Sequence, residues 1–203
     1  MKHNLAAIEA LVSRETLDRL RLFEAELRRW TLRINLIARA DIDHVWARHI
    51  LDSLQLLPLV PGEIVDGIDL GAGAGFPGMI LALARPSLKM TLIESDHRKA
   101  AFLQHIAVEL GVDVTVIAAR IETLSLARAS LVTARALAPL GQLLELAAPL
   151  LKPEGFCLFP KGRQAEIELT AASGQWHMAI GRVASCTDPD AVIFRLDGIR
   201  RVT

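Results

Sequence analysis

Cysteine is scarce in this sequence, which has only Cys157 and Cys186 among 203 residues. Two cysteines are too few for a disulfide framework or a cysteine-based zinc site, so we expect no metal centre. Both lie in predicted strands or turns, and we expect them to be buried, reduced thiols.

Net charge of either sign is also absent, because 23 lysines and arginines balance 23 aspartates and glutamates. Without a global basic field, any contact with nucleic acid has to come from a local patch. Aromatic residues make up only 4% of the chain, which argues against an extended platform for stacking bases. No apolar run is long enough to span a membrane, and the start, MKHNLAAIEA, lacks the apolar core of a secretion signal. We therefore expect a cytoplasmic protein with no membrane partner.

Hydrophobic residues are plentiful at 52%, and the length suits one well-buried domain with an extension. A first helix is predicted by apolar residues that recur at every third or fourth position: Leu17, Leu20, Phe23, Leu27, Trp30 and Ile34. A second helix is expected to begin near Asp43 and to stop at Pro58. We predict a helical extension over residues 1–60 and one compact domain over 61–203.

From Ile64 onward, short apolar runs alternate with helical stretches. Strands are predicted at 64–70, 89–94, 113–118, 130–134 and 155–159, and helices near 77–84, 98–110, 139–151 and 163–172. This alternation is typical of a parallel sheet with crossover helices on both faces. The last two apolar runs, WHMAIGRV and AVIFRL, are joined by too short a turn for a crossover helix, so they should pair antiparallel. We predict an α/β, Rossmann-like fold with N-terminal helices and a mostly parallel sheet of seven strands.

The stretch DLGAGAGFPG, residues 69–78, follows the first predicted strand, where a doubly wound sheet binds its ligand. Gly71, Gly73 and Gly75 would let the main chain approach that ligand closely. The carboxylate of Asp69 would repel a pyrophosphate and attract the sulfonium and ammonium of S-adenosylmethionine. Glu94, at the end of the second strand, can hold ribose hydroxyls, but acids at this place also occur in NAD enzymes. The closing antiparallel pair favours a methyltransferase, with a dehydrogenase or a ligand-free turn as alternatives.

Six segments occur along the chain in this order: RHILDSL (48–54), DLGAGAGFPG (69–78), ESDHRKAAFL (94–103), TARALAPL (133–140), LLKPEG (150–155) and FPKG (159–162). Together they closely resemble the glucose-inhibited division protein B family, bacterial methyltransferases that modify N7 of a guanine in small-subunit ribosomal RNA. The resemblance runs from about Trp30 to Ala172. It implies a class I methyltransferase that uses S-adenosylmethionine, with 16S ribosomal RNA as its partner.

The resemblance also implies roles for single residues. In addition to Asp69, Gly73 and Gly75 of the loop, we expect six residues to line the cofactor pocket. They are Gly71, Phe76, Glu94, Ile121, Glu122 and Arg135. Lys161 and Gly162 correspond to the rim where RNA arrives. Guanine N7 has a free lone pair, so no general base is required. We therefore expect Arg135 and Lys161 to orient the target base.

Contact with RNA is expected from a local basic stretch and the rim. The candidates are Arg28, Arg29, Arg33, Arg39, Arg48, His49 and Lys161. The alternative is that these arginines form an ordinary solvated helix face. The sequence departs from the family pattern at Thr31, Ile37 and Ser130, which puts the role of the N-terminal segment in question.

Because the chain has little basic surface, we expect its target to be displayed by a small-subunit ribosomal particle. Two further functions stay open: methylation of a small molecule, and binding of S-adenosylmethionine by an assembly factor without turnover.

Overall fold

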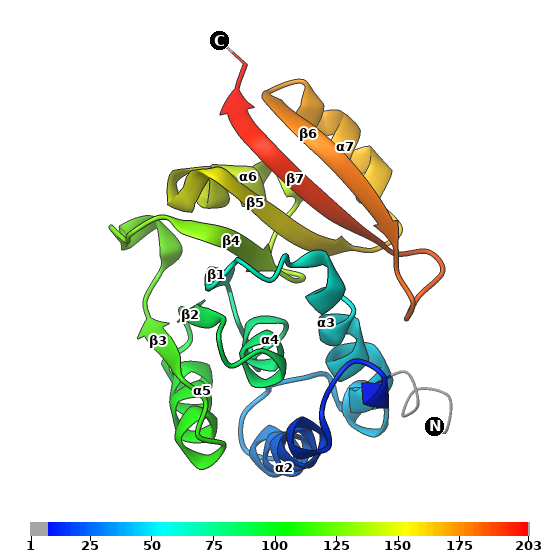
Figure 1. The fold of residues 1–203 in the computed structure, drawn as a ribbon, viewed down its shortest axis with the longest axis vertical. Helices are drawn as coiled ribbons and strands as arrows, with labels where there is room; N and C mark the ends of the chain where they lie inside the picture. The colour runs from blue at the N-terminus through cyan, green and yellow to red at the C-terminus, as the bar shows by residue number, and fades with distance from the viewer. Residues whose placement is uncertain (1–7, 203) are drawn as a thin grey trace.

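The computed structural model describes residues 8–202. Within them, seven strands form one sheet in the order β3-β2-β1-β4-β5-β7-β6 (Figure 1). The strands are β1 (Asp66–Leu70), β2 (Lys89–Glu94), β3 (Val114–Ala118), β4 (Ala129–Ala134), β5 (Leu151–Lys161), β6 (Trp176–Ala184) and β7 (Val192–Arg201). β1 to β5 pair in parallel, and β7 lies antiparallel between β5 and β6. The predicted α/β fold with its antiparallel C-terminal pair is confirmed.

The order of the strands reverses between β1 and β4, because the chain adds β2 and β3 on one side of β1 and then returns to add β4 on its other side. The connections that follow β1 and β4 therefore lead to opposite sides, so the loops at the carboxyl ends of these two strands part and leave a crevice. That crevice is where a sheet of this kind places its ligand.

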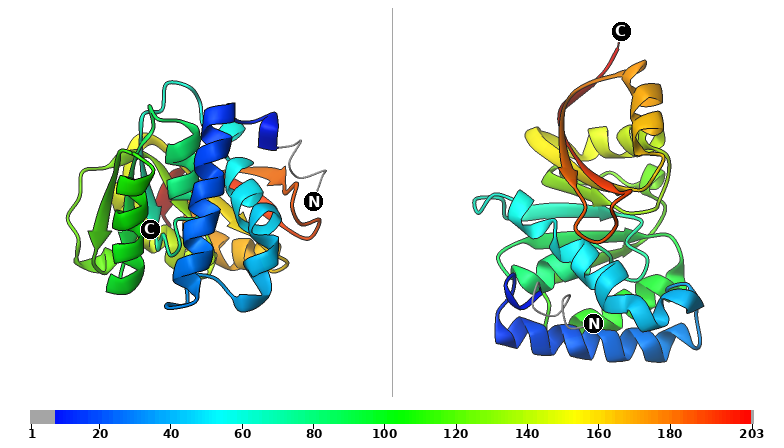
Figure 2. Two further views of the ribbon diagram at one scale, coloured as in Figure 1. Left: turned by 90° about the horizontal axis from the view of Figure 1, so that it is seen from below. Right: turned by 90° about the vertical axis from the view of Figure 1, so that its right-hand side faces the viewer.

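The helices lie in two layers, one on each face of the sheet. The longer helices are α2 (Arg14–Thr31), α4 (Gly78–Ala84), α5 (His97–Glu109), α6 (Leu140–Ala147) and α7 (Ala165–Ser173). Short helical turns are η1 (Arg39–His44), η2 (Trp46–Leu51), α3 (Asp52–Leu54), η3 (Leu57–Leu59), η4 (Ile121–Thr123) and η5 (Ala148–Leu150). Helices α2 to α5 cover one face, whereas α6 and α7 cover the other (Figures 1 and 2).

Alternating side chains along each strand fill the two cores. On β2, for example, Leu92 packs into the core under α2 to α5, and the next residue, Ile93, packs into the core under α6 and α7. Burial of such a side chain stabilises the fold by roughly 1.5–3 kcal/mol. Two continuous cores therefore hold the sheet in place and fix where its carboxyl edge lies.

The predicted N-terminal extension shares one hydrophobic core with the sheet and with helices α4 and α5. Helix α2 begins after Ser13, whose side chain accepts a hydrogen bond from Thr16 N at 3.2 Å, and it runs across the helices below the sheet (Figure 2). The ring of Phe23 meets the ring of Phe76, in the glycine loop, edge to face at 5.5 Å between centroids. It also lies 6.2 Å from the ring of Phe102 on α5. The extension thus supports the glycine loop directly.

Several boundaries and one burial state differ from the predictions. The second N-terminal helix begins earlier, at Arg39, and passes through a 3₁₀ turn and a π-helical turn before α3. Cys157 is buried, as expected, and burial raises the pKa of its thiol. The expectation of burial was wrong for Cys186, which is exposed because it lies in the loop between β6 and β7 and not in a strand of the sheet.

Two of the departures from the family pattern have local structural roles. Ser130 Oγ accepts a hydrogen bond from Lys152 Nζ at 3.1 Å, and Lys152 pairs with Asp66 at 2.8 Å. Ile37 is buried in the core under α2. In residues 8–202, no helix is both long enough and apolar enough to cross a membrane.

Candidate active site

The glycine loop joins β1 to α4 and is held in an unusual backbone conformation. Gly71, Gly73 and Gly75 have φ angles of 64°, 57° and 98°, a region that side chains with a Cβ rarely adopt. Gly73 N donates a hydrogen bond to Glu94 Oε2 at 2.8 Å, and Asp96 N donates to Glu94 Oε1 at 2.8 Å. The carboxylate of Glu94, at the end of β2, therefore fixes the loop. It also lines the cavity that opens in front of the loop.

Asp69 lies behind the glycine loop and is completely buried. Its Oδ2 accepts a hydrogen bond from Gly78 N at 3.0 Å, and its Oδ1 accepts one from Thr133 Oγ1 at 2.6 Å. Burial raises the pKa of Asp69 to about 7, against the opposing effect of these two donors. Asp69 is not among the residues that line the cavity in front of the loop. It holds the loop to α4 and β4, whereas we had expected it to face the cofactor.

This position predicts a pH-dependent effect on stability. Asp69 has a pKa of 3.8 when unfolded and about 7 when folded, so its stabilising contribution is full below the unfolded value and is lost as the pH rises through the folded value. As the pH rises from about 4 to 8, the wild type loses this contribution because Asp69 ionises. Asp69→Asn cannot ionise, so its free energy of unfolding should rise relative to that of the wild type over this range. Urea unfolding across this range measures the difference. Calorimetry should find S-adenosylmethionine binding nearly unchanged, and a large loss of affinity would restore a direct role for Asp69.

A cavity of about 570 Å³ opens in front of the loop, at the carboxyl ends of β1, β2 and β3. We call it the glycine-loop cavity. Its lining residues include Gly71, Gly73, Glu94, Ile121, Glu122 and Arg135. Six of the sequence-predicted cofactor residues thus line one cavity, while Asp69, Gly75 and Phe76 do not.

A second cavity of about 720 Å³ lies next to the first, at the carboxyl ends of β4 and β5. We call it the adjoining cavity. Residues 135–138, which follow β4, line both cavities. Ala136 has a φ of 52°, a strained value for a residue with a Cβ, and a Cβ placed on Gly71 would come within 2.7 Å of Leu137 Cδ1. Residues 135–138 therefore form a wall between the two cavities. Gly71 has no side chain, and this leaves room for Leu137 in the wall.

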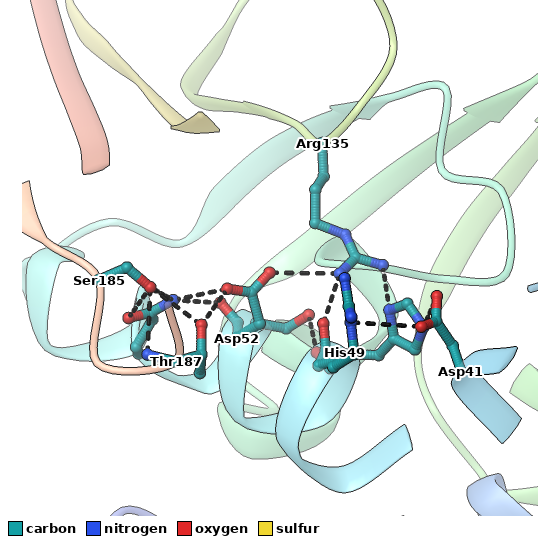
Figure 3. Close-up of polar contacts among 9 residues, drawn as sticks. Asp41, His49, Asp52, Arg135, Ser185 and Thr187 are labelled. Atoms are coloured by element: carbon teal, nitrogen blue, oxygen red, sulfur yellow. Dashed lines mark hydrogen bonds and ion pairs between the residues drawn. The ribbon is translucent and has the colours of Figure 1, made fainter. Parts of the chain in front are cut away.

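Arg135 stands in this wall and contacts the N-terminal segment (Figure 3). Its Nη1 donates to Arg48 O at 3.0 Å and to Asp52 Oδ2 at 3.2 Å, and its Nη2 donates to His49 Nδ1 at 2.8 Å. The guanidinium lies 5.0 Å from the ring centroid of Phe76. In the described part of the chain, Nε and one N–H of Nη2 have no hydrogen-bond partner. Arg135 is thus rigidly held and still has donors for a ligand.

His49 supports Arg135 as a neutral imidazole. Its ring stacks on Phe76 with centroids 4.9 Å apart, which accounts for the burial of Phe76 away from the cavity. Burial and the charge of Arg135 lower the pKa of His49 to about 4. Because Nδ1 accepts from Arg135, the proton is on Nε2, which lies 3.6 Å from Asp41 Oδ2. A histidine in this state is a poor general base at neutral pH.

Lys161 lines the adjoining cavity, but its ammonium is occupied. It donates to Ala138 O at 2.8 Å and pairs with Glu168 Oε2 at 2.7 Å. The same carboxylate oxygen accepts a hydrogen bond from Leu140 N at the start of α6 at 2.8 Å. Lys161 therefore fixes the loop between β4 and α6, and through it the wall between the two cavities.

The other RNA candidates divide into two groups. Arg48 and His49 line the adjoining cavity together with Lys161. Arg28 and Arg29 lie on α2 and pair with Glu24 at 2.9 Å and Glu26 at 2.5 Å, and neither lines a described cavity. Arg33 and Arg39 are exposed. The structure thus brings the rim candidates together and leaves the α2 arginines on a separate, charge-paired surface.

Sequence reasoning gave no role to Asp52, which the structure places at the centre of the polar network in Figure 3. Its Oδ1 accepts hydrogen bonds from Gln55 Nε2 and Thr187 Oγ1, both at 2.8 Å, while Oδ2 faces Arg135. Asp52 belongs to the segment RHILDSL, which could have drawn attention to it, but Arg135 and Thr187 lie 83 and 135 residues away along the chain.

Solved structures identify the fold class. A putative O-methyltransferase from Klebsiella pneumoniae matches with a TM-score of 0.63 at 15% identity, covering 97% of this chain and 96% of that one. The N-methyltransferase NodS from Bradyrhizobium japonicum WM9, solved with S-adenosyl-L-homocysteine, matches with a TM-score of 0.58 at 16% identity, covering 88% of this chain and 97% of that one. The chain therefore has the Rossmann-like fold of class I S-adenosylmethionine-dependent methyltransferases.

The family follows from the sequence. The model of the GidB family, rRNA small subunit methyltransferase G, matches residues 16–191, and the chain belongs to this family. Ribosomal RNA small subunit methyltransferase G of Acidiphilium cryptum (strain JF-5) is 56% identical over 196 residues, covering 96% of this chain and 90% of the relative. The protein of the same name from Gluconobacter oxydans (strain 621H) is 52% identical over 192 residues, covering 94% and 98%. The resemblance inferred from the six segments is confirmed.

The glycine-loop cavity fits S-adenosylmethionine. Gly73, at a φ of 57°, has no side chain to fill the space, and only Gly71 O would lie within 4 Å of a Cβ there. Glu94 presents a carboxylate whose oxygens each keep an acceptor site beyond their loop hydrogen bonds. Ile121 and Leu146 add apolar surface for a flat ring. In residues 8–202 no group of three or more metal-ligating side chains is assembled.

Proposed function

We propose that this chain transfers a methyl group from S-adenosylmethionine to N7 of a guanine in small-subunit ribosomal RNA. The observation that carries the proposal is the wall of residues 135–138, which separates a cavity fitted to the cofactor from a second cavity beside it. Family membership supports methylation of ribosomal RNA, and the arrangement of polar groups supports N7 as the acceptor atom.

S-adenosylmethionine, when bound, supplies an electrophilic methyl group. The chain's own residues bind and orient. Glu94 would accept hydrogen bonds from the ribose hydroxyls, and Ile121 with Glu122 would flank the adenine. The remaining N–H donors of Arg135 would hold guanine O6 or a neighbouring phosphate. Such a contact leaves the lone pair of N7 free, whereas a donor on N7 itself would block the reaction.

Among the described residues, the two nitrogen bases that line the adjoining cavity, His49 and Lys161, are not free to remove a proton from the target base. His49 is neutral with Nδ1 occupied, and the Lys161 ammonium is held by Glu168 and Ala138. Methylation at N7 needs no deprotonation, because the lone pair is present in neutral guanine. Catalysis would then come from placing the base in line with the methyl group, an effect worth up to roughly 7–11 kcal/mol in favourable cases.

The substrate we propose is 16S ribosomal RNA within a small-subunit particle in the cytoplasm. The exposed basic groups near the adjoining cavity are few, and Arg48 is partly neutralised by Asp41 at 3.2 Å. Electrostatic attraction to phosphates would therefore be modest, so the particle rather than the enzyme would present the target.

The decisive test is transfer of tritiated methyl groups to small ribosomal subunits that lack their native modification, followed by nucleoside analysis. We expect labelled N7-methylguanosine, little label on fully modified subunits as the control, and much less label on deproteinised 16S RNA. Label on another atom would overturn the N7 assignment. Comparable label on naked RNA would overturn the particle as substrate.

Salt dependence separates RNA from a small molecule as the acceptor. For each phosphate contact, the logarithm of the binding constant falls by about 0.7–0.9 per tenfold rise in salt concentration, because binding releases the counterions of that phosphate. We expect KM for the ribosomal substrate to rise with salt while kcat stays constant. A KM independent of salt would favour a small-molecule acceptor.

A further inference from the structure

We propose that Asp52 is a positioning residue for methyl transfer, which holds Arg135 and the loop between β6 and β7 as the two walls of the adjoining cavity. The inference rests on the proposed function and deepens it, because it assigns to Asp52, which lines the adjoining cavity, a role that acts through Arg135.

The carboxylate of Asp52 divides its two oxygens between the two walls (Figure 3). Oδ2 accepts from Arg135 Nη1 at 3.2 Å, on the side of β4. Oδ1 accepts from Thr187 Oγ1 at 2.8 Å, on the loop between β6 and β7. One short side chain therefore joins segments that lie 83 and 135 residues away along the chain. Among the described residues, no other side chain is hydrogen-bonded both to Arg135 and to this loop.

Gln55 reinforces the attachment of the loop. Its Nε2 donates to Asp52 Oδ1 at 2.8 Å, and its Oε1 accepts from Cys186 N at 2.8 Å. Ser185 Oγ lies 2.9 Å from Thr187 Oγ1, which closes the network within the loop. Thr187, Asp188 and Ala191 of this loop line the adjoining cavity, as Arg135 does. The distance between the two walls is thus set through Asp52.

The ion pair between Asp52 and Arg135 is largely shielded from solvent, which strengthens it. The side chains of Arg135 and Asp52 are 18% and 16% exposed, so water screens their ion pair less than a surface pair. A guanidinium that loses its acid keeps its bonds to Arg48 O and His49 Nδ1, but it can rotate about them. A displacement of about 1 Å at a reacting group can cost up to about 100-fold in rate. Loss of Asp52 should therefore act on the chemical step through Arg135.

Asp52→Asn is the primary variant, because it keeps the size of the side chain and an acceptor for Thr187 while it removes the charge that holds Arg135. With modification-deficient subunits as substrate, we expect kcat to fall about 10- to 100-fold, with little change in the Kd for S-adenosylmethionine. Asp66→Asn is the matched control. Asp66 also forms an ion pair, with Lys152 at 2.8 Å, but it lies at the start of β1, and its variant should keep the wild-type kcat.

A double-mutant cycle separates positioning from a merely structural role. If Asp52 acts through Arg135, then Asp52→Asn should lower kcat no further in an Arg135→Ala background. Additive losses of kcat in the cycle would overturn the proposal, and so would a wild-type kcat in the single variant. Thr187→Val tests the second wall, and we expect it to raise KM for the subunit more than it lowers kcat.

Folding is monitored by thermal unfolding of every variant. If Asp52→Asn does not fold, Asp52→Glu takes its place in the cycle, because it keeps the charge and displaces it by one methylene. The wild type distinguishes the two levels of inference. If it makes no N7-methylguanosine, the proposed function fails; if it does and the cycle is additive, only the role of Asp52 fails.

Discussion

Arg135→Ala is expected to lower kcat for methyl transfer about 10²- to 10³-fold, the effect typical of removing one preorganised donor from an active site. The guanidinium is the charged group common to both cavities, and three hydrogen bonds to the N-terminal segment already hold it in place. The alanine variant would lack the N–H donors that we expect to contact the base or a phosphate. The Kd for S-adenosylmethionine should change much less than kcat, because Glu94 and the glycine loop stay intact.

Arg135→Lys sharpens this prediction. A lysine keeps the positive charge but has one ammonium in place of a planar fork, so it cannot bond Arg48 O, Asp52 and His49 while it also donates to a ligand. We expect most of the loss in kcat to persist. Arg201→Ala is the control, since Arg201 pairs with Glu145 at 2.6 Å on an exposed surface. Wild-type turnover by Arg135→Ala would show that the target base is oriented by other groups.

The sheet could be predicted because its strands are short apolar runs with helical stretches between them. Parallel strands buried on both faces leave this signature, and the predicted ranges for β1 to β4 agree with the structure to within two residues. β5 was less well predicted, since it begins at Leu151, in a segment that contains Pro153 and Gly155. A register shift in its pairing with β4 accommodates this stretch, and composition alone does not reveal a bulge.

The interpretation of Asp69 shows what a motif leaves open. The spacing of the glycines locates the loop correctly, but it does not tell which way the preceding side chain points. Along β1, Ile68 and Leu70 pack under α6 and α7, so Asp69 points to the opposite face, toward the start of α4. The alternation of side chains along a strand therefore predicts the buried position of Asp69 better than the chemistry of the ligand does.

Asp52 and Phe76 show why the rest of the site could not be predicted from one sequence. The role of Asp52 depends on Arg135 and Thr187, which reach it only in the folded chain. Phe76 belongs to the glycine motif, yet its ring is covered by His49 and Phe23, from segments that precede the sheet. Pairings between distant segments need a register and a packing arrangement that local patterns do not specify.

Glu94→Ala is expected to weaken the binding of S-adenosylmethionine about 10- to 100-fold, because it removes hydrogen bonds to a charged group worth roughly 1.5–3 kcal/mol. The carboxylate accepts from Gly73 N and Asp96 N, both at 2.8 Å, so its loss also releases the glycine loop. Glu94→Gln should weaken binding less than alanine does, since the amide oxygen can still accept one of these bonds. Isothermal titration calorimetry measures both, with Glu154→Ala, an exposed acid on β5, as the control.

Glu94→Gln and Arg135→Ala should affect different kinetic constants. Glu94 acts on the cofactor alone, so saturating S-adenosylmethionine should restore most of the kcat of Glu94→Gln. Arg135 acts at the wall between the cavities, so no concentration of either substrate should restore Arg135→Ala. If saturating cofactor leaves Glu94→Gln as slow as Arg135→Ala, then the loop that Glu94 fixes also sets the geometry of transfer. The two cavities would then work as one rigid unit, because Leu137 of the wall lies against Gly71 of the glycine loop.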